Sequence, residues 1–299
     1  MKFSYLNDSF FGRLETLELN LNKNLRGYFG GKHLVSTYGQ TVEFADYREY
    51  ELGDDIRRLD WNLYSRFEKY FLKLFTDERQ MQTQIFLDAS ASMGKDNPKK
   101  SAYAVATAAA LGFLSVHNMD KVSFNVMQGD RSNNPFGTIV GKTNFFRAVG
   151  FLEDLEFDGE VDIEKCVTSA PDTSVGNGLT IIISDFFTDT DWKKAVDYLC
   201  YKKRQVLLIQ VMTPEEEDPA YDGRVSLIDS ESLDVADPKN MKIRINRNMQ
   251  KAYQMALKDF KADIHDFCTR RNVGYFCINT AVPIERMLFG ELLKAGVMK

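Results

Sequence analysis

The stretch that decides the fold is QIFLDASASMG, residues 84–94. Its apolar run at 85–87 predicts a short buried strand, and this strand ends in an acid, Asp88. Two hydroxyls, Ser90 and Ser92, come next at alternate positions before a glycine. Beyond the turn, a proline and an alanine-rich segment predict a helix from residue 98 onward. An oxygen-rich loop is therefore expected at the carboxyl end of a strand, where open α/β sheets place their ligands.

From residue 82 the sequence alternates between strand-like and helix-like segments. The strands are expected at 82–87, 122–127, 179–185, 205–212 and 273–278, with an edge strand at 137–141. The helices are expected at 98–118, 143–154, 161–169, 190–203 and 247–271, with a last one starting near Pro283. This alternation predicts an α/β fold with a mostly parallel sheet, flanked by helices and joined by right-handed crossovers.

Two segments interrupt this alternation. The acidic run PEEEDP, residues 214–219, is expected to form a solvated bend. After it, short apolar runs at 225–228 and 242–245 are expected to pair as a hairpin. We therefore expect a hairpin insertion near residues 220–246 of the α/β domain.

The sequence pattern of the first 80 residues differs from this alternation of strands and helices. Apolar residues at helical spacing predict a helix over 5–26. Glycines punctuate residues 27–39, acids, arginines and aromatics then interleave over 43–61, and an alternating strand pattern appears at 70–75. We expect residues 1–80 to form an N-terminal helix with a small β-rich subdomain, and residues 81–299 to form the α/β domain.

The composition excludes several classes of function. A net charge of −5, with no run of Lys and Arg, argues against a general nucleic-acid binder. Four cysteines without a CxxC pair and three scattered histidines argue against a zinc site and indicate reduced thiols. The most apolar stretch, 102–116, is shorter than the roughly 20 residues that a membrane span requires. A soluble, cytoplasmic protein without a membrane span is the expectation.

Two acids end apolar strands in this sequence. Asp88 comes after the run at 85–87, and Asp185 comes after the β-branched run at 179–183. Because parallel strands present their carboxyl ends at one edge, both acids should reach the same place. Together with Ser90 and Ser92 they offer the hard oxygen ligands that Mg²⁺ or Mn²⁺ prefers.

These motifs resemble known families. The pattern DASAS with a later SDF is similar to the metal-ion-dependent adhesion site of von Willebrand factor type A domains. The stretch FADYREYELGDDIRRLDW, at 44–61, with DASASM after it, resembles the bacterial family called domain of unknown function 58. The resemblance covers roughly residues 27–295 and implies a von Willebrand factor A-like, Rossmann-like fold. It also implies that Asp88, Ser90, Ser92 and Asp185 are metal ligands.

The second loop of the expected metal site departs from the family pattern. The family usually carries a threonine at a helix start, and the best match here, GEVDI at 159–163, has Val161 at that position. Valine cannot ligate a metal, although the adjacent Asp162 could compensate in part. The sequence therefore leaves open both a retained site with Mg²⁺ or Mn²⁺ and a lost one.

Three functions are compatible with this sequence. The leading interpretation is a non-enzymatic protein-interaction module that uses the metal-ion-dependent adhesion site, intact or degenerate, so that a bound metal would recruit an acidic side chain of a protein partner. The family resemblance implies a MoxR-type AAA+ ATPase, or its client, as that partner. An alternative is a Mg²⁺-dependent phosphohydrolase with Asp88 as nucleophile, but Ser90 stands where such enzymes need a general acid. The third is a metal-free scaffold whose contact surface is the arginine- and aromatic-rich stretch. The candidate contact residues are Arg48, Tyr50, Asp54, Arg57, Asp60, Trp61 and Arg66. For Arg48, Asp54, Arg57 and Asp60, an internal salt-bridge network is the competing interpretation.

Overall fold

The protein forms two compact units. The computed structural model describes residues 6, 9–14, 42–51, 54–77, 82–94, 97–171, 178–219, 223–228, 240–245, 247–287 and 290. Unit 1 comprises Met1–Leu25 with Met81–Lys299, and unit 2 comprises Arg26–Gln80.

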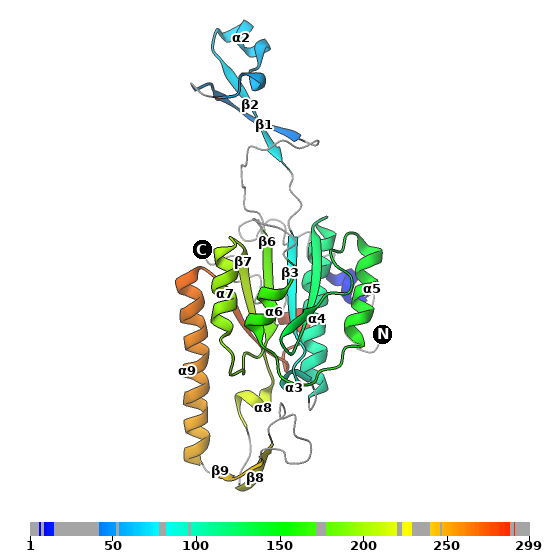
Figure 1. The fold of residues 1–299 in the computed structure, drawn as a ribbon, viewed down its shortest axis with the longest axis vertical. Coiled ribbons are helices and arrows are strands. Elements are labelled where there is room, and N and C mark those ends of the chain that lie inside the picture. The colour runs from blue at the N-terminus through cyan, green and yellow to red at the C-terminus, as the bar shows by residue number, and fades with distance from the viewer. Residues whose placement is uncertain are drawn as a thin grey trace. The chain divides into compact units, whose positions relative to one another are not determined.

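Unit 1 is built on a six-stranded sheet (Figure 1). Its spatial order is β10-β7-β6-β3-β4-β5, and every neighbouring pair is parallel except β4 and β5. The strands are β3 (Gln82–Asp88), β4 (Lys121–Gln128), β5 (Arg131–Asn133), β6 (Gly178–Ser184), β7 (Gln205–Met212) and β10 (Gly274–Asn279). The strand order reverses between β3 and β6, so these two strands flank the point where such sheets bind ligands. This confirms the predicted von Willebrand factor A-like, mostly parallel α/β fold.

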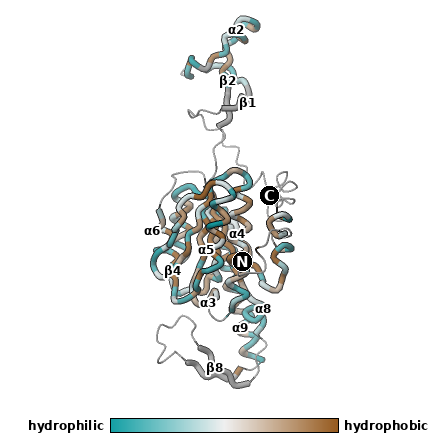
Figure 2. The backbone as a smooth tube through the Cα atoms, turned by 90° about the vertical axis from the view of Figure 1, so that its right-hand side faces the viewer, coloured by the Kyte–Doolittle hydropathy of each residue, from teal (hydrophilic) through white to brown (hydrophobic). Residues whose placement is uncertain are grey.

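Helices cover both faces of the sheet (Figure 1). One face packs against α4 (Pro98–His117), whose neighbour is α5 (Lys142–Glu153). The other face packs against α6 (Ile163–Ser169), α7 (Trp192–Tyr201) and the carboxyl-terminal part of α9 (Arg247–Arg271). Almost all of α4 is buried, which fits its alanine-rich, apolar sequence (Figure 2).

Two short helices lie at the carboxyl edge of the sheet. The loop after β3 forms α3 (Ala91–Gly94), and the loop after β7 forms α8 (Pro214–Glu217). The acidic segment at 214–219 was expected to be a solvated bend, but Thr213 and Glu216 form a capping box that starts a helical turn. The solvated-bend interpretation was therefore wrong.

The edge of the sheet also differs from the expectation. The edge strand is β5, which lies before the segment 137–141 where the edge strand was expected, and it pairs antiparallel with β4. The segment 137–141 contributes a single bridge between Ile139 and Val122. The predicted hairpin insertion forms as β8 (Gly223–Ile228) and β9 (Asn240–Ile245).

The N-terminal residues pack with unit 1. Within the expected helix at 5–26, residues 9–14 are helical and the remaining positions, apart from residue 6, lie outside the described residues. Phe10 and Leu14 are buried, and the ring of Phe11 contacts those of Phe113 on α4 and Phe146 on α5. The first 25 residues thus group with the α/β unit, which corrects the expected division at residue 80.

Unit 2 is a small hairpin with two short helices. Strand β1 (Val42–Glu49) pairs antiparallel with β2 (Phe71–Asp77), with an irregularity between Phe44 and Asp46. Between them lie the 3₁₀ turn η2 (Ile56–Arg58) and α2 (Trp61–Phe67). The small β-rich subdomain predicted from the sequence is confirmed.

Within the described residues, no helix combines the length and the apolar character that crossing a bilayer requires.

Candidate functional site

Two acids meet at the reversal point of the sheet. Asp88 is the last residue of β3, and Asp185 comes directly after β6. Ser184 donates a hydrogen bond of 2.6 Å to Asp88 Oδ2, which joins the ends of the two strands. Both carboxylates are buried, at 4% and 2% exposed. The predicted meeting of these two loops at one edge is what the structure shows.

The two hydroxyls of the first loop lie beside Asp88. The backbone N–H of Ser90 donates to Asp88 Oδ1 at 2.9 Å, and the hydroxyl oxygens of Ser90 and Ser92 are 3.1 Å apart. The N–H of Ala91 donates to the carbonyl of Gly159 at 2.9 Å, so the second loop lies against the first. Gly159 has a φ of +74°, a conformation that favours glycine.

The second loop does not supply a ligand in the expected way. The backbone of Val161 bridges Gly129, and its side chain is buried in the apolar core between the sheet and α6. Asp162 caps α6, because its Oδ1 accepts from the Lys165 N–H at 3.0 Å. Its Oδ2 forms an ion pair of 2.9 Å with the Lys165 ammonium. Asp162 therefore stabilises the start of α6 and does not take over the role of the missing threonine ligand.

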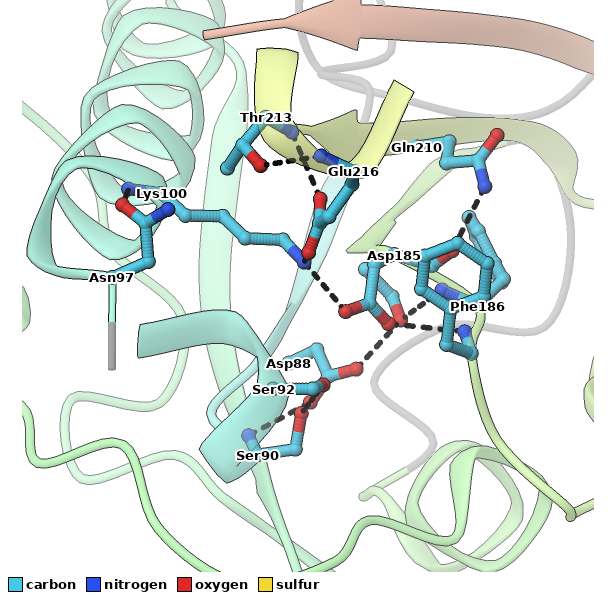
Figure 3. Close-up of polar contacts among 12 residues, drawn as sticks. Asp88, Ser90, Ser92, Asn97, Lys100, Asp185, Phe186, Gln210, Thr213 and Glu216 are labelled. Atoms are coloured by element: carbon cyan, nitrogen blue, oxygen red, sulfur yellow. Dashed lines mark hydrogen bonds and ion pairs between the residues drawn. The ribbon is translucent and has the colours of Figure 1, made fainter. Parts of the chain in front are cut away.

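A buried lysine occupies the corner next to Asp185. Lys100, in the first turn of α4, is fully buried, and its Nζ lies 2.7 Å from Asp185 Oδ2 and 2.7 Å from Glu216 Oε1 (Figure 3). Burial alone would lower the pKa of Lys100, but the two carboxylates outweigh it and the pKa is raised. Lys100 is therefore a charged ammonium held between two acids.

Glu216, which lies on α8, connects this corner to α9. Its second oxygen accepts from the Thr213 N–H at 2.8 Å, while the Tyr253 hydroxyl of α9 donates to its backbone carbonyl at 2.6 Å. The neighbouring Glu217 pairs with Lys261 of α9. A shift of Glu216 would consequently disturb both the end of β7 and the contact with α9.

Asp185 and Asp88 differ in their electrostatic surroundings. Asp185 has Lys100 as a counter-ion, and its second oxygen accepts from the Phe187 N–H at 3.0 Å. Burial, together with the nearby charge of Asp185, raises the pKa of Asp88 to about 6, although hydrogen bonds from Ser184 and Ser90 oppose the shift. Asp185 therefore has a cationic partner in this corner, whereas Asp88 is held by hydrogen bonds.

The donor set can be compared with the needs of Mg²⁺ or Mn²⁺. Such ions need several oxygen ligands in octahedral geometry. Here Val161 provides no hydroxyl, and an ammonium already lies against the Asp185 oxygen. Within the described residues, no three acidic, His or Cys side chains gather as a metal-binding group. The residues present do not fit the metal site that the family resemblance implies.

Sequence reasoning missed three polar residues of this corner. They are Lys100, Ser184 and Glu216. Ser184 could have been found, because it precedes Asp185 at the end of a predicted buried strand. Lys100 also left a signal, since a cation in the first turn of a helix is unfavourable to the helix dipole and needs another reason to be there.

Three of the seven candidate contact residues form ion pairs with other residues of unit 2. Arg48 forms an ion pair of 2.8 Å with Asp54. Asp60 is buried, caps α2 through the Asn62 N–H, and pairs with Lys73 at 3.1 Å. The competing interpretation of an internal network therefore applies to Arg48, Asp54 and Asp60.

Three of the four other candidates in unit 2 are exposed. Arg57, Trp61 and Arg66 are exposed, and no ion pair to either guanidinium occurs within the described residues. Trp61 is 62% exposed, and Ile56 and Phe67 are exposed to a similar degree. The remaining candidate, Tyr50, is half-buried, and its ring contacts that of Tyr70, which stacks on Tyr64. We call the set Ile56, Arg57, Trp61, Tyr64, Arg66 and Phe67 the aromatic–arginine surface.

The sheet order and the acids at its reversal point are those of a doubly wound α/β protein. The chain belongs to the family described as "Protein of unknown function DUF58", whose sequence model matches residues 46–262. Three uncharacterized mycobacterial proteins are similar to it. The Mycobacterium tuberculosis protein Rv1480 and the Mycobacterium bovis protein Mb1516 are each 28% identical over 225 residues, covering 73% of this chain and 70% of the relative.

Solved structures show weaker likenesses. An aerotolerance-related membrane protein from Bacteroides fragilis is 18% identical with a TM-score of 0.40, covering 72% of this chain and 96% of that one. A von Willebrand factor type A protein from Catenulispora acidiphila is 13% identical with a TM-score of 0.33, covering 46% of this chain and 34% of that one. At these scores neither likeness carries a functional argument.

Proposed function

We propose that this chain is a non-enzymatic protein-interaction module that binds a protein partner through the aromatic–arginine surface of unit 2. The observation that carries the proposal is the exposure of Ile56, Trp61 and Phe67 on the same small unit as the exposed Arg57 and Arg66. Large aromatic side chains and arginine are the residues that most often dominate binding energy at protein interfaces. Membership of a family with a von Willebrand factor A-like fold is consistent with an interaction role.

The partner class comes from the family resemblance, which implies a MoxR-type AAA+ ATPase or its client. The chemistry of the surface adds a constraint. A partner that covers Arg57 and Arg66 should present carboxylates to them, and it should offer an apolar pocket to Trp61 or Phe67. The partner face should therefore be acidic with an apolar centre.

The surroundings of Asp88 do not suit a hydrolytic nucleophile. A nucleophilic carboxylate must be able to reach its substrate, but Asp88 is buried and both its oxygens accept hydrogen bonds. The position two residues on is Ser90, which cannot serve as a general acid. These observations weigh against the phosphohydrolase alternative.

The test is a binding measurement with a MoxR-type AAA+ ATPase encoded in the same genome. We expect Trp61→Ala with Phe67→Ala to weaken binding at least about tenfold, because both side chains would be buried at the interface. A matched control is Arg147→Ala with Arg270→Ala, which removes two exposed arginines of unit 1 and should leave binding unchanged. Circular dichroism verifies that each variant is folded. Unchanged binding by the aromatic variant would refute the surface, and no binding by the unmodified chain would refute the partner class.

A further inference from the structure

We propose that the ammonium of Lys100 is the permanent cation of the Asp88–Asp185 corner, so that this corner is built without a divalent metal. The inference goes beyond the proposed function, because it concerns unit 1 and does not depend on which surface binds a partner. It rests on the contacts of Lys100 and on the disagreement between the residues present and the metal site of similar adhesion domains.

The first argument is geometric. Lys100 Nζ lies 2.7 Å from one oxygen of Asp185 and 2.7 Å from one oxygen of Glu216. Its side chain has no exposed surface, so water does not compete for these contacts. An ammonium in such surroundings persists only when acids compensate it, and each of the three groups therefore depends on the others.

The second argument is the position of Lys100 in its helix. Asn97 caps α4 and Pro98 occupies its first turn, so the start of the helix is well determined. A cation in this turn meets the positive end of the helix dipole. Lys100 therefore does not stabilise α4. Its side chain places a positive charge at the carboxyl edge of the sheet, next to Asp185.

The third argument is the set of contacts that a metal would have to displace. A divalent ion at Asp185 would compete with Lys100 for Oδ2 and would repel the ammonium. Expelling Lys100 would also remove the counter-ion of Glu216, whose backbone is tied to Tyr253 of α9. The side chain of Val161 is buried in the apolar core and has no hydroxyl group that could replace a water ligand of the ion. A tethered ammonium gives Asp185 the compensation that a metal gives in similar sites, and it also fixes α8 to the sheet.

The experiment is a calorimetric titration of MnCl₂ and MgCl₂ into the full chain after treatment with EDTA. We expect no saturable binding by the unmodified chain up to millimolar metal, and no change of its melting temperature with either ion. Saturable binding that is lost in Asp88→Ala would overturn the proposal, because it would establish a working metal site beside Lys100.

Lys100→Met tests the role of the ammonium, since it keeps the length of the side chain and removes its charge. We expect its melting temperature to fall by about 10 °C, because two acids lose their counter-ion. Mn²⁺ should then restore part of this loss, as the corner becomes open to an added cation. A Lys100→Met chain with unchanged stability and no response to Mn²⁺ would contradict the proposal.

A second variant covers the case in which Lys100→Met does not fold. Lys100→Met combined with Asp185→Asn removes both charges of the buried pair. We expect the double variant to be folded and more stable than Asp185→Asn alone, which leaves the ammonium with Glu216 only. A double variant less stable than Asp185→Asn would mean that Lys100 serves Glu216 and not Asp185, which would contradict the proposal.

Discussion

Lys100 and Asp185 form a buried ion pair, with Nζ 2.7 Å from Oδ2, between residues 85 positions apart in the sequence. The pair joins the first turn of α4 to the end of β6, directly beside the reversal point of the sheet. The metal-ion-dependent adhesion site that the sequence resembles would place a metal among these loops, whereas here the side chain of Lys100 lies among them. The charges of Asp185 and Glu216 are consequently compensated by a side chain of the protein itself.

Glu216→Gln should lower the stability of unit 1. The change removes the charge that faces Lys100 but leaves an oxygen that can still accept from the Thr213 N–H. Because Glu216 is partly exposed, we expect a loss of only about 1–2 kcal/mol in the free energy of unfolding. Glu215→Gln is the matched control, since Glu215 lies exposed one residue away and should change stability by less than about 0.5 kcal/mol. Denaturant unfolding measures both, and equal effects would refute a role for the Lys100 contact.

Asp88→Asn should change the stability of the chain, relative to the unmodified chain, in a pH-dependent way. The pKa of Asp88 is raised to about 6 from an ordinary 3.8, so the folded chain holds this proton more tightly than the unfolded chain. The contribution of Asp88 to stability is therefore greatest at low pH and falls as the pH rises from about 4 to about 6, by at most about 3 kcal/mol.

Asp88→Asn has no titrating carboxyl group at this position, so its stability lacks this fall with rising pH. Its stability relative to the unmodified chain should rise between about pH 4 and about pH 6 and then level off, in unfolding measurements made without divalent metal. A difference in stability that stays constant over this range would show that Asp88 titrates at its ordinary pKa.

Two cysteines should resist alkylation in the folded chain. Burial raises the pKa of the Cys166 and Cys268 thiols to about 12, so at pH 8 the reactive thiolate is on the order of 10⁻⁴ of each. We expect iodoacetamide to modify neither residue until a denaturant is added, with mass spectrometry locating the label. Cys200 is half-buried and serves as the internal comparison. Rapid labelling of Cys166 would mean that the core between α6 and the sheet opens readily.

The two tryptophans should differ in accessibility to a quencher. Trp192 is buried against Phe186 and Phe267, whereas Trp61 is largely exposed on unit 2. Acrylamide should therefore quench the fluorescence of Trp61 efficiently, and Trp61→Phe should leave a blue-shifted emission that is quenched several-fold less. Binding of the partner should protect Trp61 if the aromatic–arginine surface is its contact. An emission from Trp61 that is already shielded in the free chain would contradict the exposure of this surface.

The fold was predictable because its signals are local. The buried strands β3, β6 and β7 are runs of apolar residues, each with a polar residue and a helix after it, and this fixes both strand direction and the edge where loops gather. The edge strand was misplaced, since β5 has only three residues and its sequence, Arg-Ser-Asn, has no strand-like pattern. Phe11 was assigned to the wrong unit because its partners, Phe113 and Phe146, are more than 100 residues away.

The site was predictable only in part. Asp88, Ser90, Ser92 and Asp185 lie at or just after strand ends, which are visible in the sequence. The burial of Lys100 depends on how α4 packs on the sheet and on where Glu216 lies, and neither is encoded near residue 100. The split of the arginine-rich stretch into internal ties and an exposed surface was similarly hidden, since Arg48 and Arg57 look alike until their partners in the fold are known.

The most direct test of the account compares two variants in one binding measurement. A MoxR-type AAA+ ATPase from the same genome is titrated by calorimetry into the unmodified chain, into Asp88→Asn and into Arg57→Ala with Arg66→Ala. The account predicts that Asp88→Asn binds within about twofold of the unmodified chain, while the double arginine variant binds at least about tenfold more weakly. Loss of binding in Asp88→Asn, with binding kept in the arginine variant, would place the contact at the acidic corner and contradict the account.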